Sequence, residues 1–162
     1  MTEAQKLLKD FPDIFHILTN HMDAKKMRKT SERYYILNEI YKLNTHFDVD
    51  TLFKNLSDTS YRISRATIYN NLELFLECGL IVKHHFGQNL SLYEKSFGYK
   101  QHDHFICNQC QSIIEFCDPR LHQIKKSLEE ILNVTVDSHS LYLYGKCSNE
   151  KCQKGIPQRK IK

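Results

Sequence analysis

Residues Ser64–Glu94 read SRATIYNNLELFLECGLIVKHHFGQNLSLYE and combine a helical pattern with a strand pattern. Ser64 is a favoured N-cap residue, and Gly79 is a residue type at which helices commonly end, so a helix is expected between them. The apolar positions of its inner face recur at helical spacing: Ile68, Leu72, Phe75 and Leu76. Leu80–Phe86 and Leu90–Glu94 are rich in β-branched and aromatic residues and flank a short turn, which predicts a β-hairpin.

Further helices are expected before this stretch. An apolar stripe runs through Glu3–Leu18, but Pro12 lies inside it, so this helix is expected to be kinked or split. Thr30 or Ser31 can cap a second helix, and Asp48 can cap a third. Helices followed by a hairpin in this order indicate a winged-helix domain.

The pattern changes after Ser96–Gly98, which we expect to form a hinge. Strands are expected where β-branched and aromatic residues alternate with other types, at His104–Cys107, Ser112–Phe116 and Val134–Tyr144. Pro119–Leu132 is expected to be a helix with proline in its first turn. We therefore predict an α+β protein. It has a winged-helix domain at residues 1–95, a hinge at 96–98, a small α/β domain with an antiparallel sheet at 99–153, and a basic tail at 154–162.

The composition favours a folded cytoplasmic protein. The 162 residues are 41% hydrophobic, without an apolar run long enough for a transmembrane helix or an N-terminal pattern typical of a secretory signal. The net charge of +4 is too small to indicate nucleic-acid binding by itself. In a reducing compartment, paired cysteines bind metal or carry out redox chemistry more often than they form disulfides.

Two short-spaced cysteine pairs predict a zinc site. The pairs are Cys107 with Cys110 and Cys147 with Cys152. Each spacing allows both sulfurs to reach one ion, and four thiolates complete the tetrahedral coordination that zinc favours. Ordinary buried cysteines or a redox motif are the alternatives, although a redox motif requires only one pair. Cys78 is expected to be a small core residue, and the role of Cys117 stays open.

The segment Gln101–His104 is a second cluster of potential ligands. Side chains alternate in an extended segment, so His102 and His104 are expected to point one way. Gln101 and Asp103 are expected to point the other way, and the segment can therefore serve two metal sites. Imidazole and carboxylate groups suit iron, zinc, manganese or cobalt. A solvated histidine-rich loop is the alternative.

Several separate blocks resemble the ferric uptake regulator family. They read RATIYNNLELFLECGLI (65–81), HDHFICNQC (102–110), SIIEF (112–116) and HSLYLYGKC (139–147). With the second cysteine pair, the similarity extends over about residues 25–152. It implies a dimeric repressor with an N-terminal winged-helix domain and a C-terminal dimerisation domain. In such proteins metal binding favours a clamp-like dimer that grips operator DNA.

The resemblance also implies ligands for three metal sites. The matching positions for the structural zinc are Cys107, Cys110, Cys147 and Cys152. Those for a regulatory site at the hinge are His46, Glu94, His102, His104 and Glu115. Those for a further site are Gln101, Asp103, His122 and His139. The family often has His in place of Gln101 and Glu in place of His122, and a neutral amide is a poor ligand, so we expect this further site to be altered or weakened.

Other residues carry plainer expectations. Without the resemblance, His46 and Glu94 would be interpreted as exposed side chains. Glu115 interrupts an apolar run and needs a partner if its strand is buried. Surface positions are expected for His16, His21, His84 and His85.

The helix that follows Ser64 is expected to enter the major groove of DNA. Its expected contact residues are Arg65, Thr67, Tyr69 and Asn70. The family usually has Arg where Asn70 stands, so the base preference can differ from that of the common operator. Arg28 matches the family's basic segment near the minor groove, and Arg33 is expected to contact phosphate. The alternatives are solvated charges and, for Tyr69, a half-buried core aromatic.

We therefore expect a homodimeric regulator of iron uptake genes rather than an enzyme, with double-stranded operator DNA as its partner. Its expected cofactors are structural Zn²⁺ and regulatory Fe²⁺, with Zn²⁺ or Mn²⁺ able to replace iron in vitro. Neither a membrane nor a small-molecule substrate is expected. The alternatives are a sister regulator that senses zinc, manganese or peroxide, a small zinc enzyme, and a DNA-binding module that uses zinc only to fold. The family's peroxide sensors have Asp at the hinge-site carboxylates, whereas this chain has Glu94 and Glu115.

Overall fold

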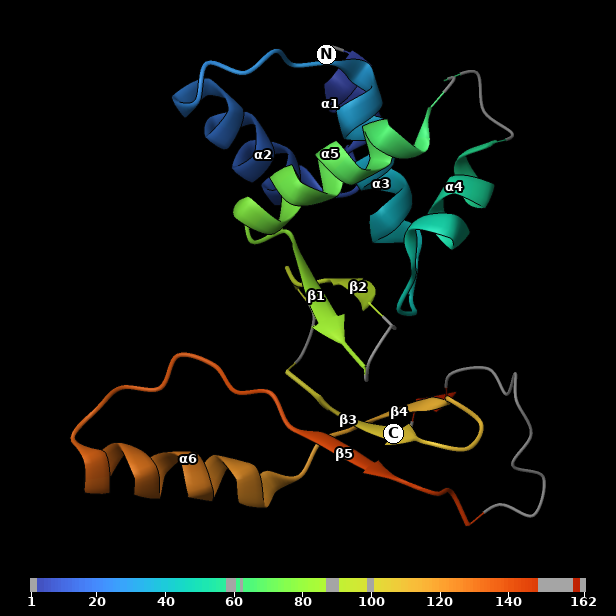
Figure 1. Cartoon of the computed structure of the whole chain (residues 1–162). Helices are drawn as coiled ribbons and strands as arrows, with labels where there is room; N and C mark the ends of the chain where they lie inside the picture. Colours follow the sequence, from blue (N-terminus) through green and yellow to red (C-terminus); the bar gives the residue numbers. More distant parts are fainter. Residues whose placement is uncertain are drawn as a thin grey trace. The chain divides into compact units, whose positions relative to one another are not determined.

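The computed structural model describes residues 3–57, 61, 63–86, 91–98, 101–148 and 159–160. The chain forms two compact units, Met1–Tyr99 and Lys100–Lys162 (Figure 1). No described helix is both long and apolar enough to cross a bilayer. The turn expected at residues 87–89 and most of the basic tail lie outside the described residues.

The first unit begins with helices. They are α1 (Glu3–Leu7), α2 (Pro12–Ala24), α3 (Ser31–Lys42), α4 (Val49–Ser57) and α5 (Arg65–Glu77). The first expected helix is split, and α2 begins at Pro12, because the N–H that proline lacks has no helical partner at this position. The caps of α5 are confirmed. Ser64 Oγ accepts a hydrogen bond from the Thr67 amide at 3.1 Å, and Gly79 follows with a φ of +66°.

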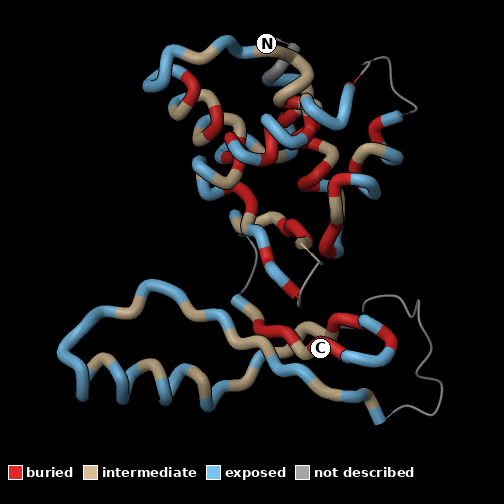
Figure 2. The backbone as a smooth tube through the Cα atoms, in the orientation of Figure 1, coloured by how far each residue is buried: buried red, intermediate tan, exposed pale blue. Residues whose placement is uncertain are grey.

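The core of the first unit lies between these helices. On α5, Ile68, Leu72 and Phe75 are completely buried, as the helical spacing predicted. They belong to one apolar cluster with side chains of α2 and α3, such as Leu18 and Leu37. Figure 2 shows the buried positions of this unit gathered where its helices meet. Leu76, the fourth residue expected on the inner face of α5, is only half-buried. Leu74 of the same helix belongs to the buried cluster.

A two-stranded hairpin follows α5. Strands β1 (Ile81–His85) and β2 (Ser91–Lys95) are antiparallel. The register pairs Val82 with Glu94 and His84 with Leu92, so His84 and Glu94 are diagonal neighbours on the same face.

In its described residues, 101–148 and 159–160, the second unit has a four-stranded sheet and one helix. The elements are β3 (Asp103–Cys107), β4 (Ile113–Phe116), α6 (Pro119–Leu132), β5 (Tyr142–Gly145) and β6 (Arg159–Lys160). The strand order is β5-β3-β4-β6. The central pair is antiparallel as predicted, whereas β5 and β6 run parallel to their neighbours, so the sheet is mixed.

The long strand expected at Val134–Tyr144 was wrong, because only Tyr142–Gly145 is a strand. In the segment that precedes β5, side chains bind backbone amides and take the place of hydrogen bonds to a neighbouring strand. The Val136 amide donates to the Glu129 carboxylate at 2.9 Å, and the Leu141 amide donates to the Asp103 carboxylate at 2.9 Å. Backbone groups that side chains satisfy in this way do not require a neighbouring strand.

Candidate functional site

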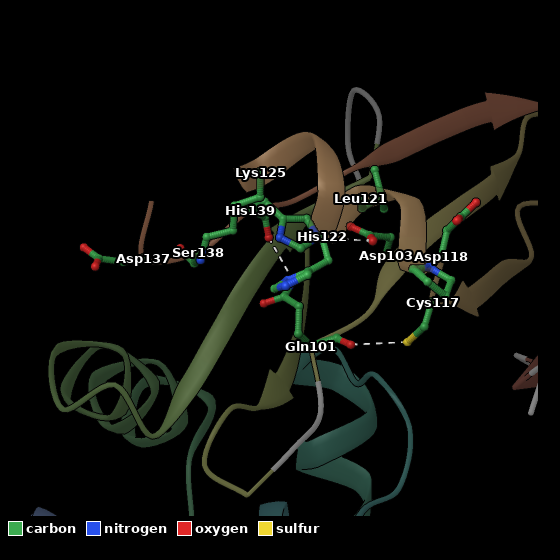
Figure 3. A pocket seen from close by; sticks show the side chains of 11 residues that line it. Gln101, Asp103, Cys117, Asp118, Leu121, His122, Lys125, Asp137, Ser138 and His139 are labelled. Carbon is green, nitrogen blue, oxygen red and sulfur yellow. Dashed lines mark hydrogen bonds and ion pairs between the residues drawn. The ribbon is translucent and has the colours of Figure 1, made fainter. Parts of the chain in front are cut away.

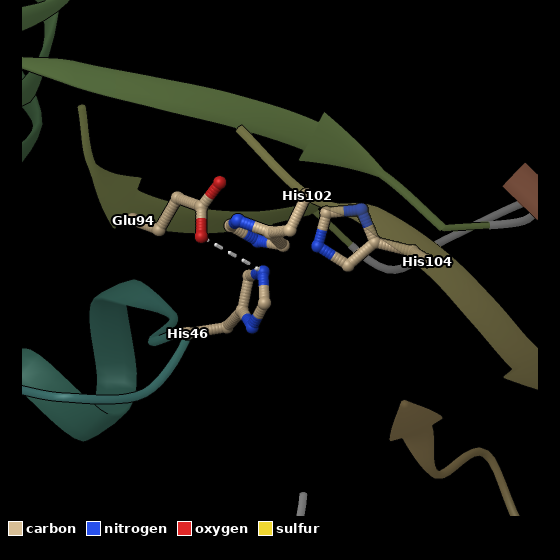
Figure 4. Close-up of side chains that lie close together, drawn as sticks. All are labelled: His46, Glu94, His102 and His104. Atoms are coloured by element: carbon tan, nitrogen blue, oxygen red, sulfur yellow. Dashed lines mark ion pairs between the residues drawn. The ribbon is translucent and has the colours of Figure 1, made fainter. Parts of the chain in front are cut away.

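A β-bridge places His46 beside Glu94 in the first unit. Phe47 and Tyr93 exchange backbone hydrogen bonds of 2.9 and 2.8 Å, which join the segment before α4 to β2. His46 precedes Phe47 and Glu94 follows Tyr93, so the bridge brings both side chains together. His46 Nε2 lies 3.2 Å from Glu94 Oε2, and the His46 side chain is 0% exposed (Figure 4). The interpretation of these two residues as exposed side chains is therefore wrong.

A third buried side chain in this unit contacts the same carboxylate. His84 Nε2 lies 2.7 Å from Glu94 Oε1, and the His84 ring stacks on Phe86 with ring centroids 5.4 Å apart. The surface position expected for His84 was therefore wrong, whereas neighbouring His85 is exposed. Val82, His84 and Phe86 stand at every second position, so alternation places His84 on the same face as two apolar residues, and this was the signal that could have identified it.

In the second unit, His102 and His104 lie close together. Their ring centroids are 4.7 Å apart, and His104 is buried (Figure 4). Glu115 lies directly opposite His104 in the antiparallel register of β3 and β4, so both occupy the same face of the sheet. This face therefore presents two imidazoles and one carboxylate.

The opposite face of the same segment lines a cavity. Asp103 Oδ2 lies 3.4 Å from His139 Nε2, and the Gln101 amide donates to the His139 carbonyl oxygen at 2.9 Å (Figure 3). His122 of α6 and Cys117 line the same cavity, whose volume is about 410 Å³. The split of Gln101–His104 between two faces agrees with the expected alternation. The Gln101 side chain binds the His139 backbone, and this contact does not require Gln101 to be a metal ligand.

Cysteine sulfurs converge at the end of β3. The Sγ atoms of Cys107, Cys110 and Cys147 all lie within 4.8 Å of one another, and Cys152 lies outside the described residues. Hydrogen bonds from the backbone amides of Cys110 and Cys147 lower the pKa of the Cys107 thiol to about 6. A thiol with this pKa is mostly thiolate at neutral pH, which is the form that binds metal. The donor set therefore fits a zinc ion.

The outer face of α5 is polar and accessible. Tyr69 is 51% exposed and lies outside the apolar core cluster, so a core position for its ring is wrong, and Asn70 is also exposed. Arg65 forms an ion pair with Asp50 at 3.0 Å, and its guanidinium lies 4.2 Å from the centre of the Phe53 ring. Thr67 takes part in the Ser64 cap through its amide.

The basic segment before α3 is held from within the unit. Arg33 Nη1 donates to the Arg28 carbonyl oxygen at 2.7 Å, and the Arg28 side chain is exposed. Arg33 is half-buried, and the same nitrogen lies 3.5 Å from the Met22 sulfur. Arg33 thus fixes the backbone from which Arg28 projects.

Comparisons with known proteins identify relatives of the chain. The model of the ferric uptake regulator family matches residues 24–144. The ferric uptake regulation protein of Vibrio anguillarum is 37% identical over 117 residues, which are 72% of this chain and 78% of that protein. The peroxide-responsive repressor PerR of Staphylococcus aureus is 33% identical over 127 residues, which are 78% of this chain and 83% of that protein.

Solved structures are similar as well. The crystal structure of the Vibrio cholerae ferric uptake regulator is 35% identical with a TM-score of 0.64, and the match covers 78% of this chain and 96% of that chain. A structure of the Francisella tularensis regulator with iron is 29% identical with a TM-score of 0.65, covering 78% of this chain and 94% of that chain.

Proposed function

Because the chain belongs to the ferric uptake regulator family, it is a metal-responsive, DNA-binding transcriptional repressor of iron uptake, and we propose that it senses Fe²⁺ with ligands from both units. The proposed regulatory ligands are His46, Glu94, His102, His104 and Glu115. The observation that carries the proposal is the buried contact between His46 and Glu94. Burial of an imidazole and a carboxylate costs desolvation free energy that their mutual contact offsets only in part, and buried ionisable groups of this kind gather at functional sites.

The spacing of this pair fits two ligands of one ion. Bonds of about 2.1 Å to a divalent ion, at angles of roughly 90–110°, separate neighbouring donor atoms by about 3.0–3.4 Å. His46 Nε2 and Glu94 Oε2 are 3.2 Å apart. Two ligands do not complete a tetrahedral or octahedral site, and the second unit offers more on the face that carries His104 and Glu115.

The switch we propose is a link between the units. His46 and Glu94 belong to the winged-helix unit, whereas His102, His104 and Glu115 belong to the other. Ligands from both units can hold one divalent ion only at a restricted angle, which raises the fraction of dimers that present both α5 helices to the operator. By linkage, operator DNA then tightens metal binding by the same factor.

We propose a structural zinc at Cys107, Cys110, Cys147 and Cys152. The convergence of the described sulfurs and the lowered pKa of Cys107 support this assignment. A cytoplasmic location, which we also propose, keeps these thiols reduced. The site at Asp103, His122 and His139 is proposed to bind metal weakly, because Gln101 replaces a ligand with an amide that already binds backbone.

We propose that the second unit forms a homodimer. Helix α6 has no buried residue, and large apolar side chains are exposed on it and near it. They are Ile124, Leu128, Ile131, Leu132, Val134, Leu143 and Tyr144. A second copy of this surface would cover them. A dimer also places two α5 helices on successive major grooves, roughly 34 Å apart.

The proposed DNA contacts are Arg28, Arg33, Arg65, Thr67, Tyr69 and Asn70. The exposure of Tyr69 and Asn70 on α5 supports base contacts, since Asn can bind adenine bidentately and an aromatic ring can contact the thymine methyl group. Arg33 is proposed to act mainly by fixing the Arg28 backbone. The bond of Arg65 to Asp50 competes with phosphate.

The similarity to PerR favours one alternative, a peroxide sensor. We expect instead that micromolar peroxide leaves the iron-loaded protein bound to DNA, because both proposed carboxylate ligands are Glu. Mass spectrometry after peroxide treatment tests this expectation. Rapid, stoichiometric oxidation of His46 or His102 would establish the alternative.

The decisive experiment measures operator affinity against each free divalent metal while zinc content is followed. We expect Fe²⁺ to tighten operator binding about 5- to 150-fold, the usual range of allosteric coupling, with one zinc retained per chain. Equal operator affinity with and without every added metal, at constant zinc content, would reduce the protein to a DNA-binding module with zinc for folding.

A further inference from the structure

Glu94 uses its two oxygens for two different partners. Oε2 lies 3.2 Å from His46 Nε2, whereas Oε1 lies 2.7 Å from His84 Nε2. All three side chains belong to the first unit and are buried. The resemblance to the family implies ligand positions for His46 and Glu94 but none for His84, so the role of His84 has to be inferred from its contacts.

The two distances indicate two kinds of contact. Donor atoms on one ion are separated by about 3.0–3.4 Å, which the Oε2 contact satisfies. A separation of 2.7 Å is shorter than this and lies at the optimum of a charge-assisted hydrogen bond. An ionised carboxylate can only accept, so His84 donates through Nε2. That nitrogen has no lone pair left for a metal.

His84 is itself held in place. Its ring stacks on Phe86 at an interplanar angle of 14°, and it lies diagonally across the hairpin from Glu94 on the same face. A buried, stacked ring that donates to Oε1 restricts rotation of the carboxylate and leaves Oε2 on the side of His46. A carboxylate fixed in this way loses less entropy when it binds a metal.

We propose that His84 is a positioning residue of the regulatory metal site, acting through Glu94. This inference rests on the proposed function of His46 and Glu94 as regulatory ligands. Hydrogen-bond partners that orient metal ligands typically contribute 10- to 100-fold in metal affinity. His84 thus belongs to the sensor although it does not touch the ion.

The test uses full-length protein that retains its zinc, with Co²⁺ as the probe, titrated by absorbance against a chelator. His84→Phe keeps an aromatic ring for Phe86 and removes the donor, and His84→Leu removes the donor with a different shape. His84→Gln retains an amide donor. His85→Leu is the matched control, because His85 is the exposed neighbour that contacts Ser91 instead.

Both donor-free variants are expected to bind Co²⁺ about 10- to 100-fold more weakly with an unchanged band shape. His84→Gln should recover most of the affinity, and His85→Leu should match the parent. In a Glu94→Ala background, His84→Phe should cause no further loss, since its effect passes through Glu94. A general loss of structure would lower the affinity in that background too, and thermal unfolding of the zinc-containing protein without Co²⁺ identifies it directly.

Three outcomes overturn the inference while the proposed regulatory site stands. The first is unchanged Co²⁺ affinity in both donor-free variants while Glu94→Ala is impaired. The second is a change in band shape like that of His46→Ala, which would make His84 a ligand. The third is an equal loss in the Glu94→Ala background. If Glu94→Ala itself leaves Co²⁺ affinity unchanged, the proposed regulatory site fails, and the positioning role with it.

Discussion

The two units of this protein bury apolar side chains to different extents. The winged-helix unit buries side chains from its helices in one apolar cluster, and α5 alone contributes Ile68, Leu72 and Phe75 without exposure. In the second unit, α6 has no buried residue, and Ile131 is 76% exposed. The first unit is therefore expected to fold on its own core, whereas the second depends on what binds to it. Zinc and a second copy are the proposed partners.

Removing the zinc should produce the largest difference in stability between the two units. In Cys110→Ser, the three remaining cysteines cannot complete the proposed site, and on the order of 10 kcal/mol of metal-binding energy is withdrawn from folding. We expect the second unit to unfold while the first retains its helical signal. Metal analysis and thermal unfolding followed by circular dichroism measure this. One zinc per chain and an unchanged melting curve would show that the cysteines are not the zinc ligands.

A substitution in the apolar core of the first unit should lower the stability of that unit alone. Leu72 is completely buried in the cluster of the first unit, so Leu72→Ala is expected to cost about 2–5 kcal/mol of its unfolding free energy. Zinc content should not change. Chemical denaturation gives the free energy, and Leu72→Met, which preserves volume, should cost less than about 1.5 kcal/mol. Loss of zinc in Leu72→Ala would mean that the units do not fold separately.

A charge on the exposed apolar face should break the proposed dimer. Ile131→Glu places a carboxylate where Ile124, Leu128 and Ile131 share one helical face, and burying an unpaired charge is costly. We expect dimerisation to weaken at least about tenfold in sedimentation experiments. Lys126→Glu, on the opposite face of α6, is the control and should remain dimeric. If both variants sediment alike, the dimer uses another surface.

The sequence predicted the helices well because their signals are local. Pro119–Leu132 was expected and observed with the same bounds, since Asp118 caps it and Pro119 occupies its first turn. Ser64 and Gly79 likewise delimit α5. Each signal acts within a few residues of the helix end, so no tertiary contact is needed to interpret it.

Strands and the site depend on partners that are distant in sequence. Val134–Tyr144 has strand-like residues, but Glu129 and Asp103 bind its backbone, which the local pattern does not reveal. His46 and Glu94 meet only because Phe47 bridges to Tyr93. The family resemblance supplied these two as ligands, but it gave no position for His84, whose contact with Glu94 was visible only in the structure.

The last comparison tests whether the two units communicate at all. His46→Ala removes an imidazole from the first unit without touching the cysteines or α6, so zinc content and dimerisation should stay intact. It should weaken metal-dependent operator binding by about 1–3 kcal/mol, or roughly 5- to 150-fold, because that is the usual size of a coupling between sites. Operator titrations by fluorescence anisotropy, with and without Fe²⁺, measure the coupling as a ratio of affinities.

Asp103→Ala is the matched variant in the second unit. It should do less, since Asp103 contacts His139 and the Leu141 amide on the other face of the segment from His104. Unchanged metal dependence in His46→Ala, together with its loss in Asp103→Ala, would place the regulatory metal in the cavity of Figure 3. The winged-helix unit would then contribute no ligand to the switch.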